Sequence, residues 1–225
     1  MTGMAAASLM LEAEVGILRT MPRPDDAAFD TFRRQTAALG RPWTTGDYGD
    51  FLRDLDRTDP LTLPVLQAAA TLFRGAGYVT FDGSTPTDTV QAAIAAPYAH
   101  ATAPLRRLVD RWTLTICLAV SRGEAVPSWV RDSLADLPGL MQDSSQRASR
   151  LDAATVNAVE AALITPLVGS RVDATIIELR GERARIQLAD PAVTAYAPVP
   201  IDARPGDVVR LRVARADIGA GEIEF

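Results

Sequence analysis

The sequence predicts an α+β protein, with a mostly helical region over residues 1–165 and a small five-stranded β-barrel over residues 166–225. Apolar residues recur at helical spacing as far as Ile164. At Thr165 and Pro166 this spacing gives way to alternation of apolar and polar residues, which is typical of half-buried strands. Glycine and proline then separate five short β-rich segments. The change of pattern predicts a domain boundary.

Several segments of the first region are predicted to be helices. Asp25 or Asp26 favours a helix start and Gly40 a helix end. Pro104 favours another start, because the missing N–H of proline costs nothing at the first helical position. In chain order the predicted helices cover residues 2–11, 25 or 26 to 39, 45–56, 60–73, 88–95 and 104–121, a short stretch from Ser128, and one or two helices over 140–164.

The second region is predicted to fold as a small barrel. Its strands are expected at residues 171–179, 183–189, 193–199, 207–217 and 221–225. Five strands of this length favour an OB fold, a Greek-key barrel that binds oligonucleotides.

Composition narrows the class of protein. Hydrophobic residues make up 48% of the chain, yet no apolar run approaches the roughly 18–20 residues of a membrane span. Met1 to Leu11 lacks the basic leading segment of a secretory signal, so we expect a cytoplasmic protein without a membrane partner. The single cysteine, Cys117, has apolar neighbours and is expected to be a buried, unreactive thiol. The net charge of −5 restricts any RNA contact to a local basic surface.

Residues 98–111 are the most informative stretch, because they place the only histidine and three arginines around one predicted helix start. With Pro104 at the first helical position, Arg106 and Arg107 would fall in the first turn, where each cation opposes the helix dipole by about 0.3–1 kcal/mol. A bound anion such as phosphate would explain this placement. The alternative is an exposed ion pair between Arg106 and Asp110, worth only about 0.2–0.5 kcal/mol.

This stretch resembles the signature of the ribonuclease II (RNB) family, Tyr-x-His-Phe-Thr-Ser-Pro-Ile-Arg-Arg-Tyr-x-Asp. The matching residues are Tyr98, His100, Thr102, Pro104, Arg106, Arg107 and Asp110. Ala103 stands where the family has serine, which removes a side-chain oxygen that would cap the helix. Two flanking segments are also similar to family elements: Leu18 to Pro22 to Leu-Arg-x-His-x-Pro, and Arg74 to Tyr78 to Arg-x-x-x-Tyr.

The resemblance implies a processive 3′-to-5′ exoribonuclease that hydrolyses phosphodiesters of single-stranded RNA and releases mononucleotides. It implies that Arg106 is a catalytic residue that contacts the scissile phosphate, and that Tyr98, His100, Thr102 and Arg107 bind RNA. Taken alone, His100 is more often a structural histidine, so we expect it only to position the RNA. The resemblance also implies that residues 1–165 are the C-terminal part of an RNB catalytic domain and that residues 166–225 are an OB-type RNA-binding barrel.

The resemblance further implies magnesium, held in the complete enzyme by aspartates of an upstream loop that ends in Asp-Asp-Ala. That loop is not found in the sequence. Residues 24–27 match it only superficially, and their two aspartates are expected to start a helix. Asp50 and Asp54 share a helical face, but interleaved arginines favour a solvated charged helix. Asp152 aligns roughly with a late family glutamate, and no metal ligand is assigned.

We therefore expect the C-terminal part of a ribonuclease II-type hydrolytic exoribonuclease, which binds single-stranded RNA but is inactive alone. The helix at residues 2–11 starts without a capping residue, which indicates that the domain begins further upstream. One alternative is a non-catalytic RNA-binding or adaptor module. The other is a helical protein-interaction domain whose arginines bind acidic partners.

Overall fold

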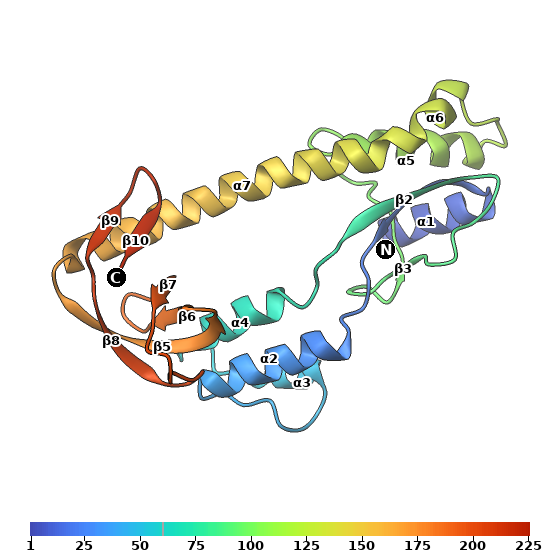
Figure 1. Ribbon diagram of the computed structural model, residues 1–225. Helices are drawn as coiled ribbons and strands as arrows, with labels where there is room; N and C mark the ends of the chain where they lie inside the picture. The colour runs from blue at the N-terminus through green and yellow to red at the C-terminus, as the bar shows by residue number, and fades with distance from the viewer. Residues whose placement is uncertain (60) are drawn as a thin grey trace. The chain divides into compact units, whose positions relative to one another are not determined.

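A computed structural model describes residues 1–59 and 61–225, and Figure 1 shows the path of the chain. Helices and antiparallel strands are both present, so the α+β class is confirmed. The chain divides into two compact units, residues 1–24 with 73–149 and residues 25–72 with 150–225. The domain boundary expected between residues 165 and 166 stays a prediction. Among the helices described, none combines the length and the apolar character needed to cross a membrane.

The first unit combines helices with two pairs of antiparallel strands. In chain order its elements are α1 (Thr2–Glu12), β1 (Val15–Thr20), β2 (Gly77–Asp82), β3 (Val90–Gln91), β4 (Ala96–Pro97), α5 (Leu108–Ser121), α6 (Ser128–Ser133), η1 (Leu134–Asp136) and the first part of α7 (Leu137–Ile164). β3 pairs with β4. β1 pairs with β2 from Val15 opposite Asp82 to Thr20 opposite Gly77. The sequence pattern did not predict these strands, because the first four residues of β1 are all buried and show no alternation.

The helix predicted over residues 88–95 is wrong. This segment forms β3 and a tight turn, and β4 begins directly after it at Ala96. The Gln91 side chain accepts the Ile94 N–H at 2.9 Å, and Ala95 has a positive φ of 57°. Such a φ interrupts a right-handed helix, and the turn already satisfies the backbone groups that a helix would use.

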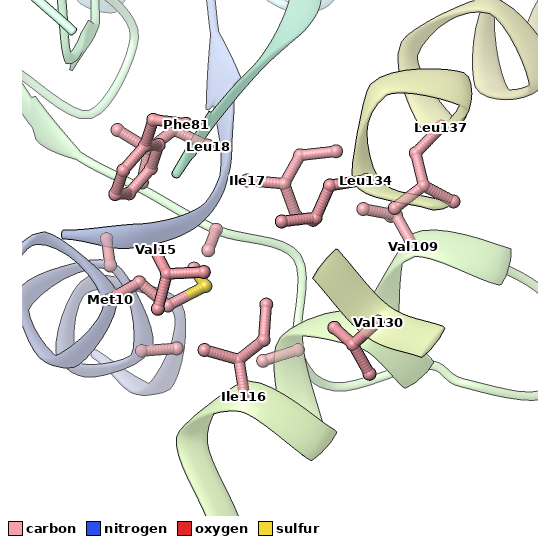
Figure 2. Close-up of a cluster of buried hydrophobic side chains, with 14 of the residues drawn as sticks. Met10, Val15, Ile17, Leu18, Phe81, Val109, Ile116, Val130, Leu134 and Leu137 are labelled. Carbon is pink, nitrogen blue, oxygen red and sulfur yellow. The ribbon is translucent and has the colours of Figure 1, made fainter. Parts of the chain in front are cut away.

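The core of the first unit lies between α1, β1, α5 and α6. Figure 2 shows Met10, Ile17, Ile116 and Val130 converging in it, and all four are buried. Gly16 permits the close approach of β1 to α1, because a Cβ at this position would lie 2.7 Å from the Met10 side chain. Each such large apolar side chain contributes about 1.5–3 kcal/mol when fully buried. This packing fixes β1, the strand that carries Arg19.

The second unit combines short helices with β-strands. Its elements are α2 (Asp26–Ala38), α3 (Tyr48–Arg53), α4 (Thr62–Ala70), the last part of α7, η2 (Thr165–Leu167), β5 (Arg171–Arg180), β6 (Arg183–Leu188), β7 (Thr194–Pro198), β8 (Val208–Arg212), β9 (Arg215–Asp217) and β10 (Glu222–Glu224). The Asp25 carboxylate caps α2 by accepting the Ala28 N–H at 2.8 Å, which confirms the predicted start. Of the helix predicted over 60–73, residue 60 lies outside the described residues.

The five-stranded closed barrel is confirmed only in part. The strands form a four-stranded antiparallel sheet in the order β7-β6-β5-β8, together with a separate β9–β10 pair, and no closure joins them within the residues described. The strand predicted over 207–217 divides at Val213, whose N–H donates to the Ser170 carbonyl. The next residue, Ala214, donates to Glu224 instead. The chain therefore exchanges its pairing with β5 for pairing with β10.

The core of the second unit lies between the sheet and the end of α7. Ile164, Ile176, Ile186 and Leu188 are among its fully buried side chains. β5 carries a bulge between Ile176 and Glu178. The extra residue places Ile176 and Ile177 in succession at buried positions, which a regular strand would direct to opposite faces.

Candidate RNA-binding site

Three segments that the sequence singled out meet in the first unit. Strand pairing places Arg19 opposite Tyr78. The Arg19 backbone N–H donates to the Tyr98 carbonyl at 2.8 Å, which attaches the segment after β4 to β1. The Arg19 guanidinium lies 4.8 Å from the centre of the Tyr78 ring. The site is therefore assembled by backbone pairing, which fixes these side chains within one cluster.

His100 lies at the centre of this cluster. Its Nδ1 shares a 2.8 Å hydrogen bond with the Tyr78 hydroxyl, and the Tyr98 ring meets the imidazole edge-on at 5.8 Å between centroids. Burial first, and then the positive charges of Arg107 and Arg19, lower the pKa of His100 from 6.5 to about 4, while Asp110 acts in the opposite direction. Burial also raises the pKa of the Tyr78 phenol. Both groups are therefore neutral at pH 7.

The prediction that Arg106 and Arg107 lie in the first turn of a helix is wrong. Helix α5 begins at Leu108, Arg107 is its N-cap residue with extended φ and ψ of −124° and 116°, and Arg106 lies in the turn before it. The cause is Asp110 in the first turn of α5, whose Oδ2 accepts the Ala103 N–H at 2.5 Å. This bond draws the loop back over the helix start and prevents Pro104 from occupying the first helical position.

Asp110 also holds Arg107. Its Oδ2 accepts a hydrogen bond from Arg107 Nη2 at 3.0 Å, and the carboxylate has no solvent exposure while the Arg107 side chain keeps 18%. The negative charge in the first turn compensates the cation at the helix start. The exposed ion pair between Arg106 and Asp110, the alternative drawn from spacing, does not form, because Arg107 occupies the carboxylate.

Arg106 is the accessible cation of the cluster. It is exposed, and its side chain makes no hydrogen bond or ion pair with any residue in the described part of the chain. The neighbouring Leu105 is 95% exposed. Thr102 is exposed as well, and its hydroxyl accepts a long 3.4 Å contact from Arg107 Nη2. The turn before α5 thus presents Arg106 to solvent, while Arg107 is fixed behind it.

Three buried polar atoms near the start of α5 have no hydrogen-bond partner among the described residues: Arg107 Nε, Asp110 Oδ1 and Thr113 Oγ1. Buried polar groups are normally satisfied, and an unsatisfied one costs about 1–3 kcal/mol. The cluster therefore retains hydrogen-bonding capacity beyond its internal contacts.

The described residues do not fit a magnesium site. No group of three His, Cys, Asp or Glu side chains in residues 1–59 and 61–225 converges as metal ligands would. The Asp110 carboxylate already accepts hydrogen bonds from the Ala103 N–H and the Arg107 guanidinium. Asp25 caps α2, and Asp50 pairs with Arg53, as expected for helix-start and solvated acids.

Arg19 and Tyr78 were not among the predicted site residues, although both lie in segments that are similar to family elements. Their pairing across β1 and β2 was the missing information, because neither strand was predicted. The roles assigned to Tyr98, His100, Thr102, Arg106 and Arg107 stay predictions; the structure brings these residues together at the segment before α5.

Comparison with known proteins identifies the second unit's β-region. Residues 170–225 match the family model described as the RNase II-type exonuclease C-terminal S1 domain. No curated protein sequence matches the chain.

Solved structures share the fold over a longer range. Mycoplasma genitalium RNase R in complex with ribose-methylated single-stranded RNA superimposes with a TM-score of 0.70 at 11% identity, covering 99% of this chain and 39% of that one. The same enzyme with double-stranded RNA gives 0.65 at 13% identity, with equal coverage. Yeast Ssd1, a pseudonuclease, gives 0.66 at 14% identity over 88% of this chain and 25% of that one. The chain thus spans about two fifths of the RNase R length.

These matches confirm the resemblance drawn from residues 98–110. The chain therefore has the fold of the corresponding part of RNase R and carries, at residues 170–225, the C-terminal S1 domain of the RNase II-type exonuclease family.

Proposed function

We propose that this chain binds the 3′ end of single-stranded RNA, with Arg106 contacting a phosphate and His100, Tyr98 and Thr102 positioning the terminal nucleotides. The observation that carries the proposal is the accessible Arg106 guanidinium at the edge of a cationic cluster. The charges that act on His100 come from three arginines and one aspartate, a balance of three positive against one negative. Such a local excess attracts phosphate although the whole chain is acidic.

The remaining contacts are consistent with a positioning role for His100. If the Tyr78 hydroxyl donates to Nδ1, the neutral ring carries its proton on Nε2 and can donate it to a ribose or phosphate oxygen. Arg107 supports the loop through Asp110, and its Nε is buried without a partner among the described residues. We therefore assign Arg107 mainly to positioning and Arg106 to direct contact.

Fluorescence anisotropy with a labelled single-stranded RNA tests the assignment. Replacing Arg106 by alanine removes a charge-assisted hydrogen bond of about 1.5–3 kcal/mol, equivalent to a loss of roughly 10- to 150-fold in affinity. It also reduces the slope of log affinity against log salt by about 0.7. Arg122→Ala is the matched control, because this exposed arginine caps the other end of α5. Equal effects of the two substitutions would refute the assignment.

We infer that the chain by itself binds RNA without hydrolysing it efficiently, since the described carboxylates do not form the metal site that the family chemistry requires. Incubation of end-labelled RNA with the chain and magnesium is expected to leave the RNA intact. Efficient release of mononucleotides would overturn this inference and favour exoribonuclease activity in the chain itself.

A second candidate function is that of a natural non-catalytic RNA-binding module. The fold similarity to Ssd1, a pseudonuclease, favours it. The two functions are distinguished by supplying the upstream part of an RNase R catalytic domain in trans. Restored hydrolysis would support a part of an enzyme, and continued RNA binding without hydrolysis would support the module.

A further inference from the structure

A hollow of about 680 Å³ lies in the second unit between the end of α7, the β5–β6 turn, β7 and β10. The β9–β10 pair lies beside α7 (Figure 1), and a Cβ on Gly221 would come within 2.8 Å of Asn157 Cβ. Gly221 also has a φ of 66°, which favours glycine. This close contact builds one wall of the hollow, whose size falls in the range of about 300–1,000 Å³ that is common for ligand sites.

One side of the hollow carries an aromatic ring and two cations. The Tyr196 side chain is 40% exposed, and the Arg180 guanidinium lies 5.5 Å from the centre of its ring. Arg183 Nη2 donates to the Tyr196 carbonyl at 2.8 Å, which keeps the second guanidinium nearby. An aromatic ring beside arginines is the combination that binds a base and its phosphate in single-stranded nucleic acids.

Glu160 of α7 lines the same hollow. Its Oε1 accepts the Thr194 N–H at 3.4 Å, a long contact, and it forms no ion pair in the part of the chain that the structure describes. Burial raises the pKa of Glu160, while the Thr194 N–H and Arg185 lower it. The carboxylate is thus partly removed from water with few donors around it. A ligand that presents two adjacent donors would complement it.

We propose that this hollow binds one guanine nucleotide of a single-stranded RNA, an inference that rests on the RNA binding proposed above. Guanine is the RNA base whose Watson–Crick edge presents N1–H and N2–H side by side, and these two donors match the two oxygens of Glu160. The Asn157 amide can donate to guanine O6. Tyr196 stacks on the base, and Arg180 and Arg183 bind its phosphate.

Anisotropy titrations with three labelled RNAs test the proposal: a uridine 12-mer and the same strand with one internal guanosine or one adenosine. The full chain is expected to bind the guanosine strand roughly 5- to 150-fold more tightly, since a bidentate base contact contributes about 1–3 kcal/mol of discrimination. Glu160→Gln is expected to abolish this preference, because the glutamine amide has only one acceptor oxygen. The fold should persist, because that oxygen still accepts the Thr194 N–H.

The control is Glu182→Gln, which changes an exposed acid in the β5–β6 turn and is expected to keep the preference. Tyr196→Leu is expected to weaken the binding of all three RNAs several-fold. Arg106→Ala is expected to weaken the binding of the three RNAs by equal factors. If the native chain binds the three strands with equal affinity, the guanine site is refuted while the proposed RNA binding stands. If the preference for guanosine survives in Glu160→Gln, Glu160 is not the residue that recognises guanine. If no strand binds, the proposed function itself fails.

Discussion

Asp110→Asn tests whether the buried ion pair organises the start of α5. The substitution keeps the shape of the side chain and an oxygen that can accept the Ala103 N–H, but it removes the charge opposite Arg107. Breaking a buried pair by neutralising one partner costs about 3–5 kcal/mol, because the other charge stays buried. The Arg107 side chain is 18% exposed and can recover some hydration, so we expect a loss of about 3 kcal/mol, at the lower end of that range.

Urea unfolding followed by circular dichroism measures this loss. In thermal unfolding it corresponds to a decrease in Tm of about 6–12 °C, at 2–4 °C per kcal/mol for a chain of this length. Asp30→Asn is the matched control, because Asp30 pairs with Arg33 at the same i,i+3 spacing on an exposed helix face. Exposed pairs contribute about 0–1 kcal/mol. Equal losses for the two variants would refute the claim that burial of Asp110 makes its ion pair important.

Two further predictions concern residues around the same cluster. His100 is the only histidine, so its NMR titration is unambiguous and should give a pKa of about 4. The unfolded chain takes up this proton near pH 6.5, and the folded chain takes it up only near pH 4. The contribution of neutral His100 to the free energy of unfolding is therefore complete above pH 6.5 and is lost as the pH falls from 6.5 through 4. A histidine that titrates at its ordinary value would contradict the buried placement. Gly3→Ala should cost about 1–3 kcal/mol in urea unfolding, because its Cβ would overlap the Tyr98 ring and the Ala99 carbonyl. Gly139→Ala in α7 is the control, because a Cβ there meets open space, and it should stabilise the protein by up to about 1 kcal/mol. Equal effects of Gly3→Ala and Gly139→Ala would show that α1 does not pack tightly against Tyr98.

Local sequence patterns predicted the features that depend on neighbouring residues in the chain. Asp25 caps α2 as expected, since a carboxylate reaches the N–H groups of the turn that follows it. The change from helical spacing to alternation near Pro166 located the β-region, because each secondary structure imposes its own period on buried residues. The spacing of residues 98–110 carried the family resemblance without any knowledge of their contacts.

Tertiary structure decided the arrangement of the candidate site. Arg19 and Tyr78 lie far apart in the sequence, and only the pairing of β1 with β2 brings them together at His100. Arg107 rather than Arg106 pairs with Asp110, because the Ala103 bond to that carboxylate delays the helix until Leu108. A spacing rule assumes that the helix has already begun, whereas the actual start depends on which side chain is buried. Burial and long-range pairing are properties of the folded chain. The sequence alone could therefore place His100, Arg106 and Arg107 in one stretch, but it could not decide which of the two arginines faces solvent.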